Sequence, residues 1–228
     1  MKAFIIGIAG RTGRRLAGRL CEAGVGVNGL ARHPGQVEEL ASNGMTATLG
    51  DIADIDADTL AVLLGKADVV VFTAGAADSE PDDAMDRVDR DGVTKTIAAA
   101  RRVGGMRVFL VSAFPEALRG GDVDPSFERY IRIKKSSEIE LAASGLEWVI
   151  LRASVLLDTP GVGTVSLGFA QCHTQVTRDD VASTLAGLIL TPSVSRVILE
   201  VTAGDTPVAA AIEWIDGQLR HGRPERSS

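Results

Sequence analysis

The chain has 228 residues and a net charge of −6, and 45% of its residues are hydrophobic. This length and composition can supply the core of one sizeable α/β domain. The acidic balance, without a long basic run beside a recognisable nucleic-acid motif, argues against a nucleic-acid partner. No apolar stretch approaches the roughly 20 residues that cross a bilayer, and the start does not read as a cleavable signal, so we expect a cytoplasmic protein away from membranes.

The first thirteen residues predict a strand that turns through glycines into a helix. The apolar run from Phe4 to Ile8 is too short for a helix and suits a strand buried on both faces. Leu16 and Leu20 lie four apart, so a helix begins at about Thr12. Between strand and helix stand three glycines, Gly7, Gly10 and Gly13. We call residues 7–13 the glycine turn.

The glycine turn suits a phosphate ligand. Glycines let the backbone approach a ligand closely, and the free amides and dipole at a helix N-terminus favour an anion. The GxxGxxG pattern is a relative of the dinucleotide fingerprint GxGxxG, placed between a strand and a helix as that motif requires. A tight turn without a ligand is the alternative.

Strands and helices alternate along the rest of the chain. The predicted strands cover residues 25–30, 46–49, 68–72, 107–111, 148–151 and 196–201. The predicted helices cover residues 34–40, 56–64, 85–103, 127–143, 178–190 and 208–219. This alternation predicts a single Rossmann-like domain over residues 1–220, with a doubly wound, mainly parallel sheet and helices on both faces.

Two long connections, 113–126 and 152–176, follow predicted strands. Open α/β sheets bind ligands outside the carboxyl ends of their strands, so we expect substrate loops here, surface decoration being the alternative. Residues 221–228 are polar and predicted to be disordered. Cys21 and Cys172 are expected to be buried free thiols, and no metal site is predicted because the three histidines are scattered.

Arg32 stands where dinucleotide-binding sheets select their cofactor. It lies 19 residues after Gly13, and no Asp or Glu occurs between Val27 and His33. An acidic residue here binds the ribose of NAD, whereas an arginine accommodates the 2′-phosphate of NADP. We therefore expect NADP(H) rather than NAD(H), with Arg11 as a second charge. A solvated arginine without a ligand is the alternative.

Tyr130 and Lys134 are the catalytic candidates. Their spacing of four residues places the phenol and the ammonium on one helix face. A nearby ammonium favours the tyrosinate, which suits the phenol to acid/base catalysis. Ser112, after the strand 107–111, is expected to place its hydroxyl in the same cleft. An ordinary amphipathic pair is the alternative, since YxxxK is a common pattern.

Several short segments form a pattern that is more specific than any one of them. They are Gly7–Gly13, Ala31–Arg32, Gly50–Ile52, Thr73–Gly75, Val88–Ile97, Tyr130–Lys134, Ser144–Arg152 and Thr177–Ala182. With them the chain resembles the atypical short-chain dehydrogenase/reductase family. The similarity is to its small NAD(P)H-binding branch of epimerase-like oxidoreductases, biliverdin and flavin reductases and NmrA-like proteins, and it spans about residues 1–205.

The resemblance implies that these segments surround NADP(H). The glycine turn would hold the pyrophosphate, Arg32 the 2′-phosphate, and Asp51–Ile52 the adenine. Lys134 would contact the nicotinamide ribose, and the segment after Arg152 would lie along the nicotinamide. The implied contacts are Gly7, Gly10, Arg11, Thr12, Gly13, Arg32, Asp51, Ile52, Thr73, Ala74, Gly75, Lys134, Arg152, Ala153 and Ser154.

These residues predict an NADPH-dependent oxidoreductase, monomeric or homodimeric, acting on a small carbonyl, quinone or flavin. Tyr130 would serve as acid/base, as the tyrosine does in active members of the family. One alternative is a non-catalytic NADP(H)-binding redox sensor or interaction protein. An aromatic content of only 4% favours it, as does Ala153-Ser154 where the family has Pro-Gly. An NAD-dependent epimerase or dehydratase is the third option, disfavoured by the short region after Gly145.

Overall fold

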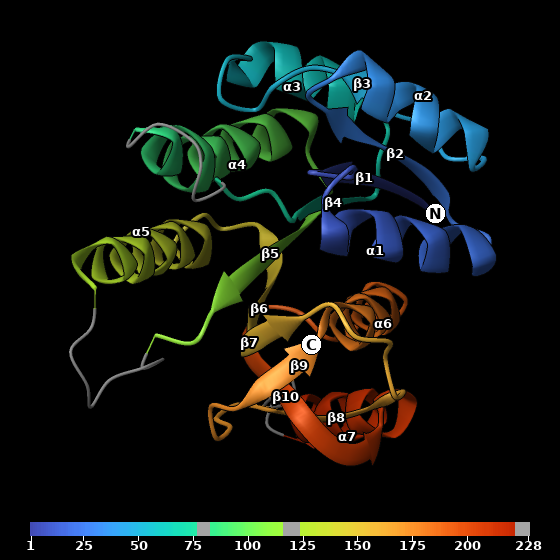
Figure 1. The fold of residues 1–228 in the computed structure, drawn as a ribbon, viewed down its shortest axis with the longest axis vertical. Helices are drawn as coiled ribbons and strands as arrows, with labels where there is room; N and C mark the ends of the chain where they lie inside the picture. Colours follow the sequence, from blue (N-terminus) through green and yellow to red (C-terminus); the bar gives the residue numbers. More distant parts are fainter. Residues whose placement is uncertain (77–82, 116–123, 222–228) are drawn as a thin grey trace, which may run out of the picture.

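The computed structural model describes residues 1–76, 83–115 and 124–221 (Figure 1). Its main-sheet strands are β1 (Lys2–Ile6), β2 (Gly26–Ala31), β3 (Thr48–Leu49), β4 (Val69–Phe72), β5 (Arg107–Ala113), β6 (Glu147–Ala153), β8 (Thr164–Gly168) and β10 (Val197–Pro207). Its helices are α1 (Arg11–Glu22), α2 (Pro34–Ser42), α3 (Ala57–Leu64), α4 (Asp91–Val103), α5 (Pro125–Ala142), α6 (Arg178–Ile189) and α7 (Val208–His221). A small parallel sheet pairs β7 (Val155–Leu157) with β9 (Gln175–Thr177), and a π-helical turn, η1 (Asp86–Arg90), leads into α4.

The main sheet has eight strands in the order β3-β2-β1-β4-β5-β6-β10-β8. Neighbouring strands are parallel except β8, which pairs antiparallel with β10. The chain winds outward from β1 in one direction and from β4 in the other, as in a Rossmann-like fold. The predicted α/β, doubly wound, mainly parallel architecture is confirmed.

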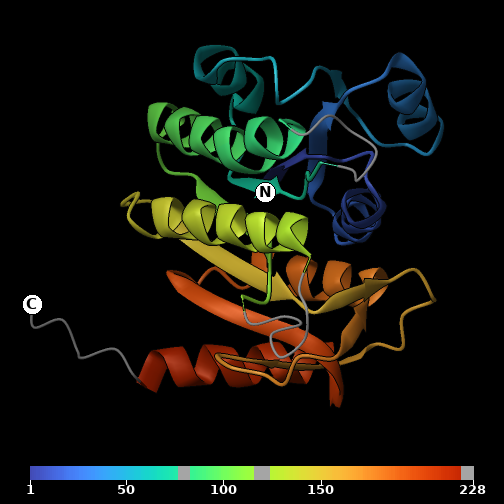
Figure 2. The ribbon, with the colours of Figure 1, turned by 60° about the vertical axis from the view of Figure 1, so that its left-hand side comes forward.

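Successive side chains of the central strands alternate between two hydrophobic layers, one on each face of the sheet. In β1, Ala3 and Ile5 belong to one buried cluster, whereas Phe4 and Ile6 belong to the other. The first cluster is completed by α1, α6 and α7, and the second by α3, α4 and α5. Figures 1 and 2 show these helices on opposite faces of the sheet. Burial on both faces explains the continuous apolar runs of the central strands.

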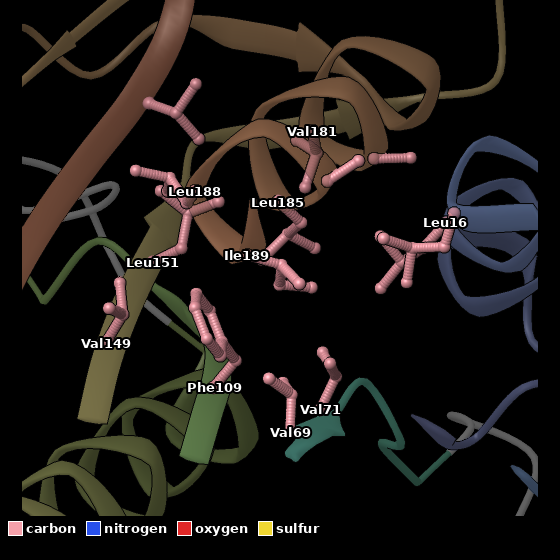
Figure 3. Packing of buried hydrophobic residues seen from close by; sticks show 14 of the residues in the cluster. Leu16, Val69, Val71, Phe109, Val149, Leu151, Val181, Leu185, Leu188 and Ile189 are labelled. Atoms are coloured by element: carbon pink, nitrogen blue, oxygen red, sulfur yellow. The ribbon is translucent and has the colours of Figure 1, made fainter. Parts of the chain in front are cut away.

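Phe109 of β5 is a fully buried anchor of the first layer. Figure 3 shows its ring between the strand side chains Val69 and Val71 on one side and Val149 on the other, with Leu185 of α6 nearby. An aromatic side chain fully enclosed in this way removes a large apolar area from water. The ring therefore helps to fix α6 against the sheet.

Arg107, two residues earlier in β5, binds the C-terminal end of α6. Its guanidinium donates to the carbonyl oxygens of Ile189 (2.9 Å) and Val194 (2.8 Å). The last carbonyls of a helix lack intrahelical partners and carry the negative end of the dipole. The arginine therefore satisfies the C-terminus of α6 and joins it to the sheet.

The prediction that 152–176 is an irregular connection is wrong. This region contains the end of β6 together with β7, β8 and β9. Pairing with β8 also extends β10 past the predicted end at residue 201, through a bulge between Thr202 and Thr206. A Cβ on Gly204 would lie 2.4 Å from the amide nitrogen of Ser166, so only glycine allows the two strands to approach here. In the sequence, Gly204 and Pro207 indicate a turn, so the predicted strand ended before them.

The other boundaries differ by a few residues. Helix α5 begins at Pro125, two residues before the predicted start, because Asp124 accepts a hydrogen bond from the amide of Ser126 at 2.9 Å and caps the helix. Cys21 and Cys172 are exposed free thiols, not buried as expected. Residues 116–123 of the predicted loop 113–126, and the predicted tail 221–228 except His221, lie outside the described residues.

Among residues 1–76, 83–115 and 124–221, no helix is both long enough and apolar enough to cross a membrane. The His, Cys, Asp and Glu side chains of the same residues form no group that could hold a metal ion.

Replacement of Phe109 by alanine tests its anchoring role. We expect Phe109→Ala to lower the free energy of unfolding by about 3–5 kcal/mol, because the enclosed site cannot collapse around the lost ring. Val62→Ala on α3 is the control, since Val62 is 79% exposed and its truncation should change stability by less than about 0.5 kcal/mol. Urea denaturation followed by circular dichroism measures both, and equal effects would contradict the packing described.

Candidate functional site

A cleft of about 870 Å³ runs along the carboxyl ends of the sheet strands. Its walls come from the segments that follow β1, β2, β4, β5 and β6, together with side chains of α5 and the start of α6. Residues that follow β1 and β4 both line the cleft, and the strand order reverses at the junction of these two strands. Open α/β sheets bind ligands at this switch point, and the volume lies in the usual range of roughly 300–1,000 Å³ for ligand sites.

The glycine turn forms the wall of the cleft beside β1. Gly7 has φ of +88°, and a Cβ there would lie 2.8 Å from the amide nitrogen of Ala74. A Cβ on Gly13 would lie only 2.2 Å from the carbonyl oxygen of Gly7. Glycine at these positions therefore lets α1 start directly against the ends of β1 and β4.

The N-terminus of α1 has no capping side chain. Its N-cap residue, Gly10, makes no side-chain hydrogen bond, and the first turn contains no acidic residue. Gly10, Arg11 and Thr12 all line the cleft. The first amides of a helix lack intrahelical partners, so a phosphate bound here would complete the cap.

Arg32 lies at the end of β2 on the rim of the same cleft, with Asp51 and Ile52 beside it. Arg32 is exposed and Ile52 is buried. Lys95 of α4 donates to the carbonyl oxygens of Ile52 (2.8 Å) and Ala53 (2.9 Å), which fixes this turn against the helix. The arrangement offers a cation at the rim and an apolar side chain below it.

Thr73, Ala74 and Gly75 follow β4 and line the centre of the cleft. The hydroxyl of Thr73 donates to the carbonyl oxygen of Ile6 at 3.0 Å, which joins the ends of β4 and β1. The amide of Ala76 donates to Asp89 Oδ2 at 2.9 Å. Asp89 belongs to the π-helical turn and is 1% exposed. The turn thus directs a buried carboxylate at the cleft wall, as π-helical turns at functional sites often do.

Lys134 is buried between Asp89, β5 and Tyr130. Its ammonium donates to the carbonyl oxygen of Val111 at 3.0 Å and to Asp89 Oδ1 at 3.4 Å, and it lies 5.9 Å from the centre of the Tyr130 ring. Burial is the largest influence and disfavours the ammonium, but Tyr130, Asp89 and Glu138 together outweigh it and raise the pKa of Lys134. Lys134 is therefore a fixed positive charge near neutral pH.

Ser112 and Tyr130 line the end of the cleft beyond Lys134. The Ser112 hydroxyl is buried and has no hydrogen-bond partner among the described residues. Leaving a buried hydroxyl unpaired costs free energy, which an oxygen atom of a ligand in the cleft would recover. The structure thus brings the three predicted catalytic residues into one place.

Two pairs of rings surround this end of the cleft. Phe114 and His173 have centroids 5.3 Å apart, and Phe127 and Tyr130 have centroids 6.0 Å apart. All four line the cleft. Of these rings only Tyr130 was predicted from the sequence. Phe114 and His173 lie in two other chain segments, whereas Phe127 lies three residues before Tyr130, a helical spacing that could have identified it. The four rings can pack against a planar ligand.

Gly13 and Arg152 do not line the cleft, although both were predicted to contact the cofactor. Gly13 instead makes the close approach to Gly7. The guanidinium of Arg152 bonds Glu138 of α5 (2.7 Å) and Glu200 of β10 (3.3 Å). The hydrogen bond to Glu138 raises the pKa of Arg152, with burial opposing it. Arg152 is therefore committed to an ion-pair cluster within the protein.

Ala153 and Ser154, in contrast, line the cleft as predicted. The Ser154 hydroxyl accepts from the amide of Thr174 at 2.9 Å, which holds the segment that carries His173. Arg178 at the start of α6 also lines the cleft, although no role was predicted for it from the sequence. The only sequence signal for a role of Arg178 in the cleft was that it lies in the Thr177–Ala182 segment, one of those that carry the family resemblance.

The residues of the cleft fit a dinucleotide. The glycine turn leaves room that any Cβ would fill, Arg32 and Arg11 supply positive charge, and Ser112 offers an unpaired hydroxyl. Residues 7–192 match the sequence profile of the NAD(P)H-binding family. The chain belongs to this family. The predicted resemblance is thereby confirmed.

Individual relatives agree with this assignment. The chain is 31% identical over 214 residues to YhfK of Bacillus subtilis, described as an uncharacterized sugar epimerase, and the match covers 93% of this chain and 99% of YhfK. A Bacillus halodurans structure provisionally named an NAD-dependent epimerase/dehydratase has a TM-score of 0.85 and 26% identity, covering 94% of this chain and 99% of that one. ChuY of Escherichia coli O157:H7, an anaerobillin reductase, has a TM-score of 0.74 and 25% identity, covering 90% and 98%.

Two glycines of α1 give a matched test of the glycine turn. We expect Gly13→Ala to destabilise the protein by about 1–3 kcal/mol, since the new methyl group would strike the backbone of Gly7. Gly18→Ala in the same helix meets no atom within 4 Å and should stabilise it by about 0.5–1 kcal/mol. Thermal and urea denaturation of both variants give the comparison, and changes of the same sign would contradict the close approach.

Proposed function

We propose that the protein is an NADPH-dependent oxidoreductase of the cytoplasm that reduces a small carbonyl, quinone or flavin, as a monomer or homodimer. The observation that carries this proposal is the convergence of three features on one cleft. These are the glycine turn, the arginine at the end of β2, and the triad of Ser112, Tyr130 and Lys134. When bound, NADPH would supply a hydride. The side chains of the cleft would bind NADPH and would deliver a proton to the reduced substrate.

The choice of NADPH depends on Arg32. A guanidinium forms bidentate, charge-assisted hydrogen bonds to a phosphate, and the neighbouring glutamine, Gln36, offers a further polar group in the cleft. The Gln36 side chain already accepts from the amide of His33 at 3.2 Å, so it holds the turn that carries Arg32. No acidic side chain stands at the end of β2 to favour the ribose of NAD.

The proton would come from Tyr130. A hydride arriving at a carbonyl carbon leaves negative charge on the oxygen, and the phenol would protonate that oxygen. The ammonium of Lys134 stabilises the tyrosinate so formed, because its charge is fixed by Asp89 and lies beside the ring. Ser112 would donate its unpaired hydroxyl to the same oxygen. Solvent then returns a proton to Tyr130.

The rings support a planar acceptor. Phe114, Phe127, Tyr130 and His173 together supply the stacking surface that the low overall aromatic content would not suggest. ChuY, a structural neighbour, is an anaerobillin reductase. The rings therefore favour quinone and flavin acceptors over small aliphatic carbonyls.

A redox sensor is the second candidate function. It is favoured by Arg152-Ala153-Ser154 at the end of β6, where the resembled family has Arg-Pro-Gly, and by the commitment of Arg152 to two glutamates. A sensor must bind NADPH and NADP+ with different affinities, since only differential affinity shifts a conformational equilibrium. An epimerase is a third candidate because YhfK and the Bacillus halodurans protein carry that description.

Cofactor choice is tested by Arg32→Ala. We expect NADPH affinity to fall about 10–100-fold, because charge-assisted hydrogen bonds to the 2′-phosphate are lost, while NADH affinity stays unchanged. Calorimetric titration of NADPH and NADH measures both. Arg102→Ala is the matched control, since Arg102 pairs with Asp58 at 2.7 Å and does not line the cleft. Equal losses for the two dinucleotides would contradict the assignment of the 2′-phosphate to Arg32.

Proton transfer is tested by Tyr130→Phe. We expect kcat with carbonyl and quinone acceptors to fall about 10²–10⁴-fold at unchanged NADPH affinity, because the ring stays and only the acid is lost. Reduction of flavin should persist, since flavin accepts hydride directly. Stopped-flow absorbance of NADPH gives the rates. Unchanged turnover with every acceptor would remove the catalytic role of Tyr130.

A further inference from the structure

One carboxylate oxygen joins two arginines at the phosphate end of the cleft. Asp158 Oδ2 lies 2.6 Å from Arg11 Nη1 and 2.9 Å from Arg178 Nη1. Arg11 belongs to the glycine turn, Arg178 is the first residue of α6, and Asp158 follows β7. The bridge therefore connects the segment after β6 with the start of α1, where the pyrophosphate is expected.

The three side chains differ in how firmly they are held. The Arg178 side chain is 12% exposed and also donates to the carbonyl oxygen of Leu156 at 3.2 Å. The Arg11 side chain is 68% exposed and that of Asp158 is 46% exposed. Arg178 is thus a fixed cation, whereas Arg11 and Asp158 can change rotamer without losing much packing.

Positive charge exceeds negative charge at this corner. Arg15 and Arg19 of α1 both lie near Asp179 Oδ1, at 3.2 Å and 3.8 Å. With the bridge and Asp180, the neighbour of Asp179 in the first turn of α6, four arginines of the described residues face three aspartates. Burial and then the charge of Arg11 lower the pKa of Arg178, and Asp158 opposes them. Helices α1 and α6 also begin side by side here and add the positive ends of their dipoles (Figure 1). The corner favours an anion of more than one charge.

The segment that carries Asp158 is anchored independently of the bridge. The amides of Val162 and Gly163 donate to the Asp180 carboxylate at 3.1 Å and 2.8 Å. The N-cap of α6 is Thr177, whose hydroxyl accepts from the amide of Asp180 at 3.0 Å. The Asp180 carboxylate is therefore available to hold the amides of residues 162 and 163. Asp158 can leave the arginines by a local movement while residues 161–163 stay in place.

We propose that Arg178 is a second anchor for the dinucleotide pyrophosphate, and that Asp158 holds Arg11 and Arg178 in the phosphate's place until the dinucleotide binds. This inference rests on one part of the proposed function, the binding of a dinucleotide in the cleft, and is independent of the reaction that follows. A pyrophosphate carries more negative charge than one carboxylate and accepts bidentate hydrogen bonds, so it displaces Asp158 from both arginines. Asp158 is then an internal competitor that weakens cofactor affinity.

The test is calorimetric titration of the full chain with NADPH, NADH and adenosine 2′-monophosphate, which has the adenine and 2′-phosphate but no pyrophosphate. We expect Arg178→Met to weaken NADPH and NADH by the same factor, about tenfold or more, and to leave the monophosphate unchanged. Asp158→Asn should strengthen both dinucleotides several-fold, and this gain should be smaller in the double variant with Arg178→Met, because the competitor then acts through Arg11 alone.

Two further variants separate charge from structure. Arg178→Lys keeps the positive charge and should retain part of the affinity that Arg178→Met loses. Arg102→Met is the matched control, because Arg102 pairs with Asp58 but does not line the cleft, and it should bind all three ligands normally. Urea denaturation of each variant shows whether the fold is intact.

Two results would overturn the inference. One is dinucleotide affinity that Arg178→Met leaves unchanged; the other is loss of the monophosphate by the same factor as the dinucleotides. If the unaltered protein binds NADPH normally in either case, the proposed function stands and only the role of Arg178 and Asp158 fails. If the unaltered protein binds no dinucleotide, the proposed function fails as well.

Discussion

The contact of Gly13 with the carbonyl of Gly7 is the constraint on which the site depends. It lets α1 begin against the ends of β1 and β4, at the point where the strand order of the sheet reverses. A side chain at Gly13 would push the helix away from Gly7, and one at Gly7 would strike the backbone of Ala74 after β4. With the helix in this position, its uncapped amides face the same cleft as the segments after β2, β4 and β5. The phosphate end of the site is therefore built mainly from backbone, and its geometry follows from packing.

The end of the cleft around Tyr130 is built differently, from charged side chains buried beneath α5. Ser112, Arg152 and Glu200 are paired neighbours on β5, β6 and β10, so their side chains share one face of the sheet. Glu138 of α5 meets Arg152, and Lys134, one turn earlier, meets Asp89. Breaking a buried ion pair leaves an uncompensated charge, so these pairs fix α5 in orientation as well as position. The Tyr130 side chain is held where the rings of the cleft surround it.

The two ends divide the work of one cleft. In the proposed function, the arginines and the glycine turn would recognise phosphate groups and confer affinity, whereas the hydroxyls, the ammonium and the rings would act on the reacting part of the ligand. The Asp158 bridge belongs to the first end. The segment between β7 and β9, which carries Asp158, reaches the second end at Thr174, whose amide donates to Ser154 just before β7. The same segment that holds the phosphate arginines therefore also positions His173. Membership in the NAD(P)H-binding family agrees with this division.

The sequence alone determined the order of the elements, because strand and helix periods and glycine breaks are local properties of the chain. It therefore predicted the doubly wound sheet, the glycine turn and the YxxxK helix face. It did not reveal β8, whose partner is a glycine-containing extension of β10, or the role of Arg152, whose ion pairs join three separate elements. The rings around Tyr130 and the Asp158 bridge are likewise long-range contacts. Only the tertiary structure decides these, since residues distant in the chain meet through packing and not through any spacing in the sequence.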